Sequence, residues 1–190
     1  MLSRSRATDN RFYGVFTGIV TSVVQDKSKE GKVTVTLPWF DDQTELECRV
    51  CQIYAGKGYG AFFVPEERDE VLVAFINGDM RFPIILGGLY NGVDKPPTFR
   101  ATDKDQKMIR TKGGHQLILD DTSGAEKITI VDKSGNNSIE IDSVGDAITI
   151  SAKTGKLTLN AKEIEIQAST QMNVEAGGTL NIKGMTINLN

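Results

Sequence analysis

Cysteine and histidine are the residue types in this 190-residue chain that most often bind metals or act as nucleophiles. Cys48 and Cys51 form a single Cys-x-x-Cys, and the only histidine, His115, lies far from them in sequence. A structural zinc site needs a second pair of ligands, and residues three apart on a strand point to opposite faces. The spacing therefore predicts no metal or redox site at the cysteines, and a capping or hydrogen-bonding role for His115.

Two further patterns could carry chemistry: an acidic pair and a run of glycines. Asp69 and Glu70 are neighbours, and neighbours on a strand point to opposite faces, so a solvated turn is favoured over an acid–base pair. The glycines at Gly56, Gly58 and Gly60 are not followed by Gly-Lys-Ser/Thr or by a helix, as a phosphate-binding loop requires. They predict a tight loop with positive φ instead. We therefore predict no catalytic residue, no cofactor and no metal, and hence no enzyme.

Composition divides the chain into two parts. The eight Phe, four Tyr and one Trp all precede residue 100, and the net charge of −3 leaves no basic footprint for nucleic acid. The basic start at Met1 is not followed by an apolar core, as a signal peptide would be. No apolar run approaches the ~18 residues of a membrane span. These features predict a protein that is made and kept in the cytoplasm until it is assembled.

The aromatic part has the pattern of a small β-barrel. Residues 1–12 are polar and predict a flexible arm, and residues 92–107, with Pro96-Pro97, predict an extended neck. No segment between them has convincing helical periodicity. Five strands separated by turn residues suit a Greek-key barrel of the OB type over residues 13–91. The predicted strands are 14–24, 32–39, 46–53, 70–75 and 83–89.

The aromatic-free part, residues 108–190, is an internal repeat of short β segments, each with an apolar pair spaced one residue apart. No amphipathic helix is present to cover these apolar faces, whereas three chains wrapped together would bury all of them on one axis. We interpret the repeat as an intertwined trimeric β-helix, or β-prism; a monomeric β-solenoid or one sheet of a sandwich are the alternatives. The predicted prism core is Leu117, Leu119, Ile128, Ile130, Ile139, Ile141, Ile148, Ile150, Leu157, Leu159, Ile164, Ile166, Met172, Val174, Leu180 and Ile182, and Ile187/Leu189 form the last pair.

Eight short motifs follow one another along the chain. They are Tyr13-Gly-Val-Phe-Thr-Gly-Ile-Val, Gly31-Lys-Val-Thr-Val-Thr-Leu-Pro38, Ala55-Gly-Lys-Gly-Tyr-Gly60, Phe63-Val-Pro-Glu, Asp69-Glu-Val-Leu-Val-Ala-Phe75, Asn77-Gly-Asp79, Pro83-Ile-Ile-Leu-Gly-Gly-Leu-Tyr-Asn-Gly92 and Thr111-Lys-Gly-Gly-His-Gln-Leu-Ile-Leu-Asp-Asp-Thr122. In this order and spacing they resemble phage baseplate assembly protein V and the VgrG-type spike proteins of contractile injection systems. Arg68 is a departure, because the family usually has glycine before Asp-Glu-Val.

The resemblance implies a structural, trimeric central spike that transmits force and punctures a target cell envelope. The implied partners are a baseplate hub protein at the barrel end and a PAAR-type tip protein at the apex. After assembly the protein would sit in the baseplate of a virion or injection apparatus, from which it could be ejected through the target envelope. The terminal His-x-His that holds an iron at the apex in some members of the family is absent here. The residues expected to form the tip-binding platform are Met185, Ile187, Leu189 and Asn190.

Two other functions fit parts of the pattern. A nucleic-acid-binding OB protein is disfavoured by the acidic charge balance. An adhesin or depolymerase on a β-helical stalk is disfavoured because the repeat has no aromatic residue to bind sugars.

Overall fold

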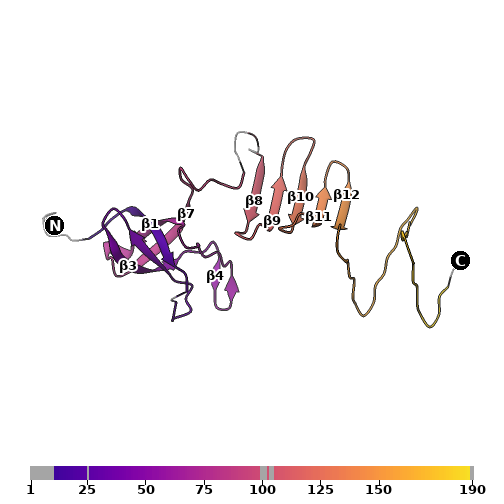
Figure 1. Cartoon of the computed structure of the whole chain (residues 1–190), viewed down its shortest axis with the longest axis horizontal. Coiled ribbons are helices and arrows are strands. Elements are labelled where there is room, and N and C mark those ends of the chain that lie inside the picture. Colours follow the sequence, from indigo (N-terminus) through magenta and orange to yellow (C-terminus); the bar gives the residue numbers. More distant parts are fainter. Residues whose placement is uncertain (1–10, 25, 99–101, 103–104, 189–190) are drawn as a thin grey trace, which may run out of the picture. The chain divides into compact units, whose positions relative to one another are not determined.

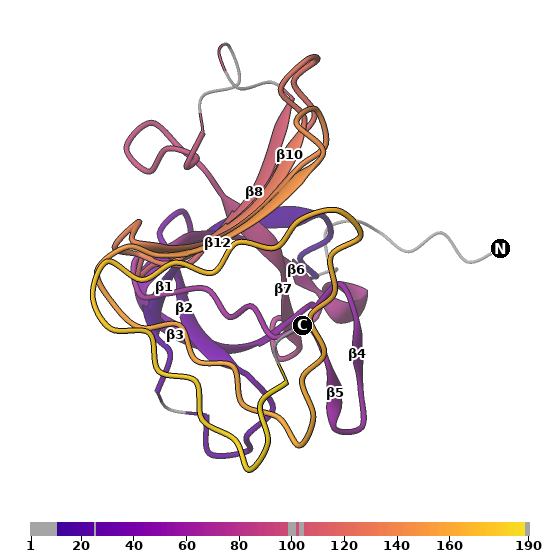
Figure 2. The same ribbon diagram turned by 90° about the vertical axis from the view of Figure 1, so that its right-hand side faces the viewer.

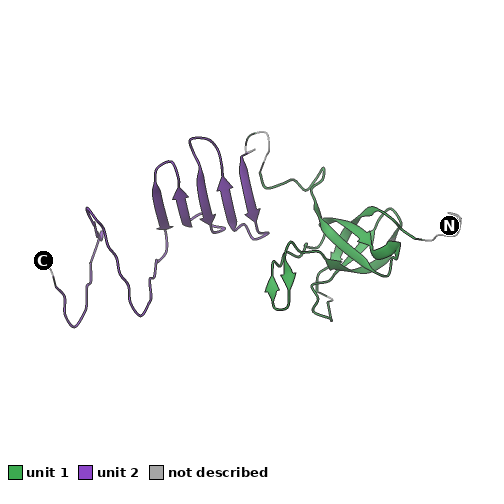
Figure 3. Ribbon diagram, turned by 180° about the vertical axis from the view of Figure 1, so that it is seen from behind, with its two compact units in different colours: residues 1–102 green, residues 103–190 purple. Residues whose placement is uncertain are grey.

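The computed structural model describes residues 11–24, 26–98, 102 and 105–188. The chain divides into two compact units, Met1–Thr102 and Asp103–Asn190, which are described separately below (Figure 3). Part of the predicted neck, at 99–101 and 103–104, lies outside the described residues.

The first unit is a closed barrel of five strands in the order β1-β2-β3-β7-β6 (Figure 1). All neighbours are antiparallel except β3 and β7, which pair in parallel only at Arg49–Ile84 and Val50–Ile85. With the short β4–β5 hairpin set aside, the strand order 1-2-3-5-4 is that of an OB barrel, as predicted. The strands are β1 Val15–Ser22, β2 Val33–Leu37, β3 Asp41–Val50, β6 Glu70–Phe75 and β7 Pro83–Leu89.

The barrel encloses one apolar core. On β6 the buried residues alternate with partly exposed ones, because successive side chains of a strand point to opposite faces. The β-branched valines that dominate the core also favour strand backbone. The buried apolar residues are Val20, Val33, Val35, Leu37, Cys48, Val71, Val73, Phe75 and Ile85.

The two cysteines lie in different environments, as their spacing predicts. Cys48 is fully buried in the barrel core, whereas Cys51 is exposed. Burial raises the pKa of the Cys48 thiol to about 12, because the thiolate would lose its hydration. Cys48 is therefore a small core residue rather than a nucleophile.

Aromatic rings close one end of the barrel. Phe12 contacts Phe16, Trp39, Phe40 and Phe75 at centroid distances of 5.7–6.3 Å. Its backbone N–H also donates to the carbonyl oxygen of Gly78 at 2.8 Å. The arm predicted to be flexible over residues 1–12 therefore needs a correction at Phe12, which is anchored to the barrel because it buries an aromatic ring; residues 1–10 lie outside the described residues.

The turns around β6 keep the backbone that the motifs suggest. Arg68, at the position where the family usually has glycine, adopts a left-handed φ of +79°. The backbone N–H of Arg68 donates to the carbonyl oxygen of Val20. The carboxylate of Asp69 closes the turn by accepting a hydrogen bond from the backbone N–H of Glu66. The predicted Asn77-Gly78 turn begins as a short 3-10 helix, η2 (Ile76–Gly78), with φ of +53° at Asn77. The connection from β6 to β7 is thus longer than a two-residue hairpin.

The second unit contains an antiparallel sheet in the order β12-β11-β10-β9-β8 (Figure 1). Each strand pairs with the next along the chain, through turns that contain the glycines Gly114, Gly124, Gly135 and Gly145. These ladders lie within one chain, because short turns bring consecutive strands together, and the intertwining of chains stays a prediction. The strands are β8 Gln106–Arg110, β9 Gln116–Asp120, β10 Lys127–Val131, β11 Asn137–Asp142 and β12 Ala147–Ala152.

Beyond β12 the chain forms no further strand in residues 153–188, all of which are described. Figure 2 shows this segment winding in wide loops instead of adding to the sheet. The repeat predicts β segments here as well, and within a single chain they do not form. A strand needs partners for its backbone groups. In this segment the Lys153 N–H donates to the Asn136 carbonyl at 3.0 Å, and no ladder continues beyond it in residues 154–188.

Candidate functional site

The register of the second sheet aligns its apolar residues in two rows on one face. In the first row Ile109 faces Leu117, which faces Ile130, and the row continues through Ile139 to Ile150. All five side chains point to the same face, because directly opposed residues of antiparallel strands share a face. The second row, one pleat away, is Leu119, Ile128, Ile141 and Ile148.

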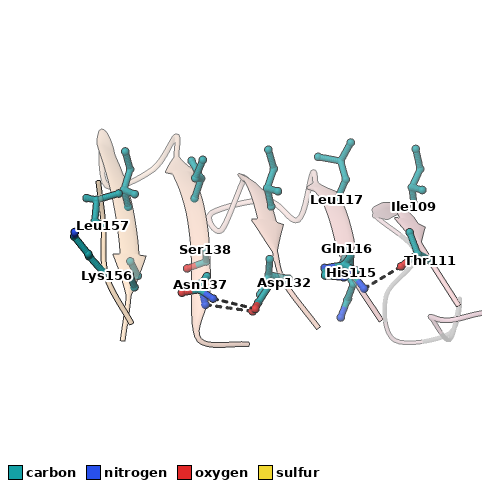
Figure 4. Close-up of a pocket in the computed structure, with 16 residues that line it drawn as sticks. Ile109, Thr111, His115, Gln116, Leu117, Asp132, Asn137, Ser138, Lys156 and Leu157 are labelled. Atoms are coloured by element: carbon teal, nitrogen blue, oxygen red, sulfur yellow. Dashed lines mark hydrogen bonds between the residues drawn. The ribbon is translucent and has the colours of Figure 1, made fainter. Parts of the chain in front are cut away.

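The other residues that the structure describes do not cover these rows. Their exposed fractions run from 40% at Ile128 to 73% at Ile148, apart from Leu117, which is half-buried. The first row forms the floor of an open groove of about 590 Å³, with Leu157 and Lys156 at its far edge (Figure 4). A continuous apolar surface of this kind marks an association site, since burying each side chain fully is worth about 1.5–3 kcal/mol.

The opposite face of the sheet is largely polar. Glu140 lies directly between Thr129 and Thr149 in the ladder, and its carboxylate is 3.6 Å from the ammonium of Lys127. Met108 and Ile118 are the apolar residues at the β8–β9 end of this face. The sheet is therefore two-sided, with one largely polar face and one apolar face.

Aspartates at the ends of three strands hold the connecting turns. Asp132 accepts hydrogen bonds from the Ser134 hydroxyl at 2.8 Å and from the Asn137 side chain at 3.0 Å, and the latter bond is drawn in Figure 4. These bonds, the Ser134 bond first, lower the pKa of Asp132 to about 2. The carboxylate of Asp120 accepts from the backbone N–H of Thr122, and that of Asp142 accepts from the backbone N–H of Val144. Hydrogen bonds within each turn lower the pKa of both aspartates.

The lowered pKa of Asp132 predicts an acid-sensitive sheet. A carboxyl whose folded pKa lies below its unfolded value of about 3.9 adds stability at neutral pH, and loses it as pH falls from about 4 toward 2. We expect the melting temperature of the Asp132→Asn variant to lie below that of the parent at pH 7, and the two to converge near pH 2. Circular dichroism melts over this pH range would check the expectation. A difference that stays constant with pH would contradict it.

His115 lies in the turn between β8 and β9. Its backbone N–H donates to the Thr111 hydroxyl at 3.1 Å, and its carbonyl accepts from the Thr111 N–H at 2.9 Å. The residue thus helps to close the β8–β9 turn, beside the groove (Figure 4). In the ranges that the structure describes, no three His, Cys, Asp or Glu side chains gather as a possible metal site.

The remaining predicted core residues lie outside any strand. Of the expected tip-binding platform, Met185 and Ile187 are exposed, whereas Leu189 and Asn190 lie outside the described residues. Of the remaining predicted core residues, Leu157 lines the groove together with the first row. The exposed core residues are Leu157, Leu159, Ile164, Ile166, Met172, Val174, Leu180 and Ile182.

One member of the apolar row is missing from the predicted core. Ile109 begins the first row on β8, a strand that starts at Gln106 and so before the predicted start of the repeat at 108. The signal in the sequence is weak, because the residue two positions earlier is Lys107 rather than an apolar one. Ile109 is identified only by its register with Leu117.

The comparisons with known proteins agree with the barrel. Residues 16–90 match the family of the type VI secretion system/phage-baseplate injector OB domain. The chain is 32% identical over 110 residues to the type VI secretion system spike protein VgrG3 of Vibrio cholerae, covering 53% of this chain and 11% of that protein. It is 31% identical over 126 residues to the spike protein VgrG1a of Pseudomonas aeruginosa, covering 59% of this chain and 20% of the relative.

The matches span only about a tenth to a fifth of these relatives' length. A further Vibrio cholerae relative, 33% identical over 110 residues, is named an actin cross-linking toxin, VgrG1, but the match covers 53% of this chain and only 10% of that protein. In the described part of this chain no helix is long and apolar enough to cross a bilayer. The ordered motifs, the five-stranded barrel and these matches together identify residues 16–90 as an OB domain of the type VI secretion system/phage-baseplate injector kind, and show that the chain is similar to VgrG spike proteins.

Proposed function

We propose that this protein is a non-enzymatic, trimeric central spike at the baseplate of a contractile injection machine. The observation that carries the proposal is the pair of apolar rows on the β8–β12 sheet, which no described part of the chain covers. Three copies that turn these faces to a common axis form a three-sided prism. Each chain then contributes one whole sheet as one side of the prism.

The segment after β12 supports the same assembly. Ordering each of its residues costs about 1–2 kcal/mol, and its own chain returns no ladder hydrogen bonds over residues 154–188. Its apolar pairs, from Leu157/Leu159 to Leu180/Ile182, continue the pattern of the sheet. Strands from two further copies would supply backbone partners and cover these pairs. The chains would thus lie side by side up to Ala152 and intertwine beyond it.

A prism of this construction has a mechanical use. Backbone hydrogen bonds and a continuous apolar core along the axis resist bending, so the prism transmits axial force when the machine contracts. The barrel end docks on the baseplate hub, and the apex, including Met185 and Ile187, carries a PAAR-type tip protein. The assembled spike makes transient contact with the target envelope. The polar face with Lys127 and Glu140 stays in water.

Neither alternative function has an observation in its favour. The net charge of −3 does not suit a nucleic-acid-binding barrel. A sugar-binding stalk needs aromatic platforms, and no aromatic residue follows Phe99.

Light scattering tests the proposal directly. The full chain is expected at three times its mass of 20.8 kDa, and a truncation that ends at Asp103 is expected at the mass of one copy. A full chain with the mass of a single copy would refute the spike. A mass of two copies would indicate a sheet-on-sheet sandwich instead.

A further inference from the structure

A preformed hairpin of the barrel has no role in the function proposed so far. It is built from β4 (Ala55–Gly56) and β5 (Tyr59–Gly60) and follows β3 in the chain (Figure 1). The Gln52 side chain fixes its base, since it donates to the Phe63 carbonyl and accepts from the Phe63 N–H, both at 3.0 Å. The N–H of Ala61 donates to the Tyr54 carbonyl at 2.8 Å.

The glycines of this hairpin fix its shape for different reasons. Gly58 and Gly60 have φ of +77° and +142°, as the sequence predicts. Gly56 does not have a positive φ, so that part of the prediction needs a correction: a Cβ there would overlap the ring of Tyr59. The hairpin is therefore a rigid element rather than a loose loop.

The side chains of the hairpin and of the residues beside it are mostly apolar, yet they are exposed to water. Ile53 is 91% exposed and Phe62 76%, and Tyr54 and Tyr59 are also exposed. A rigid surface of exposed aromatic and aliphatic groups is suited to binding, since little conformational entropy is lost on docking. Lys57, at the tip, is the only charged residue between Cys51 and Pro65.

The same barrel carries a groove whose lining, like the hairpin, is largely apolar. Because β3 and β7 pair only at Arg49–Ile84 and Val50–Ile85, the earlier part of β3 separates from η2 and β7. A hollow of about 370 Å³ opens there, large enough for an aromatic side chain. Its apolar lining comes from Leu46, Ile76, Met80, Phe82, Pro83 and Ile84.

The charges around the groove favour a cation. Two of its basic residues are neutralised locally, since Lys32 is 3.1 Å from Glu30 and Arg81 is 2.6 Å from Asp79. Glu45 and Glu47, the two carboxylates of the lining, lie two residues apart on β3 and so on the same face, with Arg49 beyond them. A hairpin with one lysine at its tip is complementary to this rim.

We infer that the hairpin of each barrel inserts into the β3–β7 groove of the next copy, with Lys57 beside Glu45 and Glu47. A contact between two different patches closes into a ring when the rotation fits the number of copies. The inference rests on the proposed trimer, in which the prism holds the barrels at high effective concentration, so that a small contact suffices.

Disulfide trapping tests the contact in the full chain. In a Cys51→Ser background, which removes the exposed natural thiol, Lys57→Cys is combined with Glu47→Cys and oxidised mildly. A disulfide needs the two Cα atoms within about 4.4–6.8 Å. We expect covalent dimers and trimers on a non-reducing gel, with loss of most of the monomer band. The matched control combines Lys57→Cys with Glu67→Cys, an exposed residue outside the groove, and is expected to remain largely monomeric on the gel.

The outcomes separate this inference from the spike proposal. Light scattering is measured on both variants before oxidation. A trimer without a covalent ladder, or with a cross-link inside one chain, overturns the hairpin contact and leaves the spike intact. A ladder equal in the control also overturns it, because the trapping would then be unspecific. A chain with the mass of one copy overturns both.

Discussion

The full chain carrying Ile139→Lys is expected to have the mass of a single copy in light scattering, whereas the parent is expected to have the mass of three. Ile139 lies in the middle of the first apolar row, between Ile130 and Ile150. In the proposed prism, three lysine ammonium groups would meet near one axis without counter-charges. The desolvation penalty is several kcal/mol for each ion, and mutual repulsion adds to it, so the loss exceeds the contribution of any single side chain.

The matched control for this variant is Thr149→Lys. Thr149 lies on the neighbouring strand, on the opposite face, and directly faces Glu140. The substitution introduces the same side chain into the same sheet, where it stays in water beside a carboxylate. We expect this variant to remain a trimer. If Ile139→Lys were also trimeric, the apolar rows would not be the assembly surface.

The second large effect is expected on the stability of the barrel, when Gly18 is replaced. A Cβ at this position would lie 2.5 Å from Cγ1 of Val35 and 3.1 Å from the backbone oxygen of Thr36. Val35 is fully buried and the other atom is backbone, so neither moves aside cheaply. Overpacking of this kind costs about 1–3 kcal/mol. Gly18→Ala is therefore expected to lower the unfolding free energy of the barrel by this amount, measured by urea denaturation followed by Trp39 fluorescence.

Gly87→Ala is the control for the barrel variant. Gly87 also lies in a barrel strand, but a Cβ there would meet no atom within 4 Å. Replacing glycine in a strand reduces the entropy of the unfolded chain, so we expect stability equal to the parent or higher by up to about 1 kcal/mol. Equal losses in both variants would show that the effect comes from replacing glycine in general and not from the contact with Val35.

Most of the barrel follows from local sequence pattern. The predicted strands at 70–75 and 83–89 match β6 and β7, because each is bounded by turn residues and carries alternating or continuous apolar side chains. The start of β3 at Asp41 is missed, because Asp41, Asp42 and Gln43 are poor strand formers. They join the strand because β2, across a tight turn, supplies a partner such as Leu37 for Asp41.

The two apolar rows, which form the candidate assembly site, could also be predicted only in part from the sequence. Alternation alone identifies the apolar residues of β9 to β12, since the period of two is a property of each strand. That these residues form two straight rows, and that Ile109 joins them, depends on register, which the turns between strands determine.

Sequence by itself thus determined the all-β class, the OB barrel, the family resemblance and the absence of a helix that could cover the apolar repeat. Tertiary structure decided which strands pair within one chain. Residues 106–152 satisfy their backbone hydrogen bonds locally, because short turns bring consecutive strands together. Residues 153–188 have the same alternation but no ladder. The physical reason is that alternation specifies which face is buried, whereas a strand exists only where a partner accepts its hydrogen bonds.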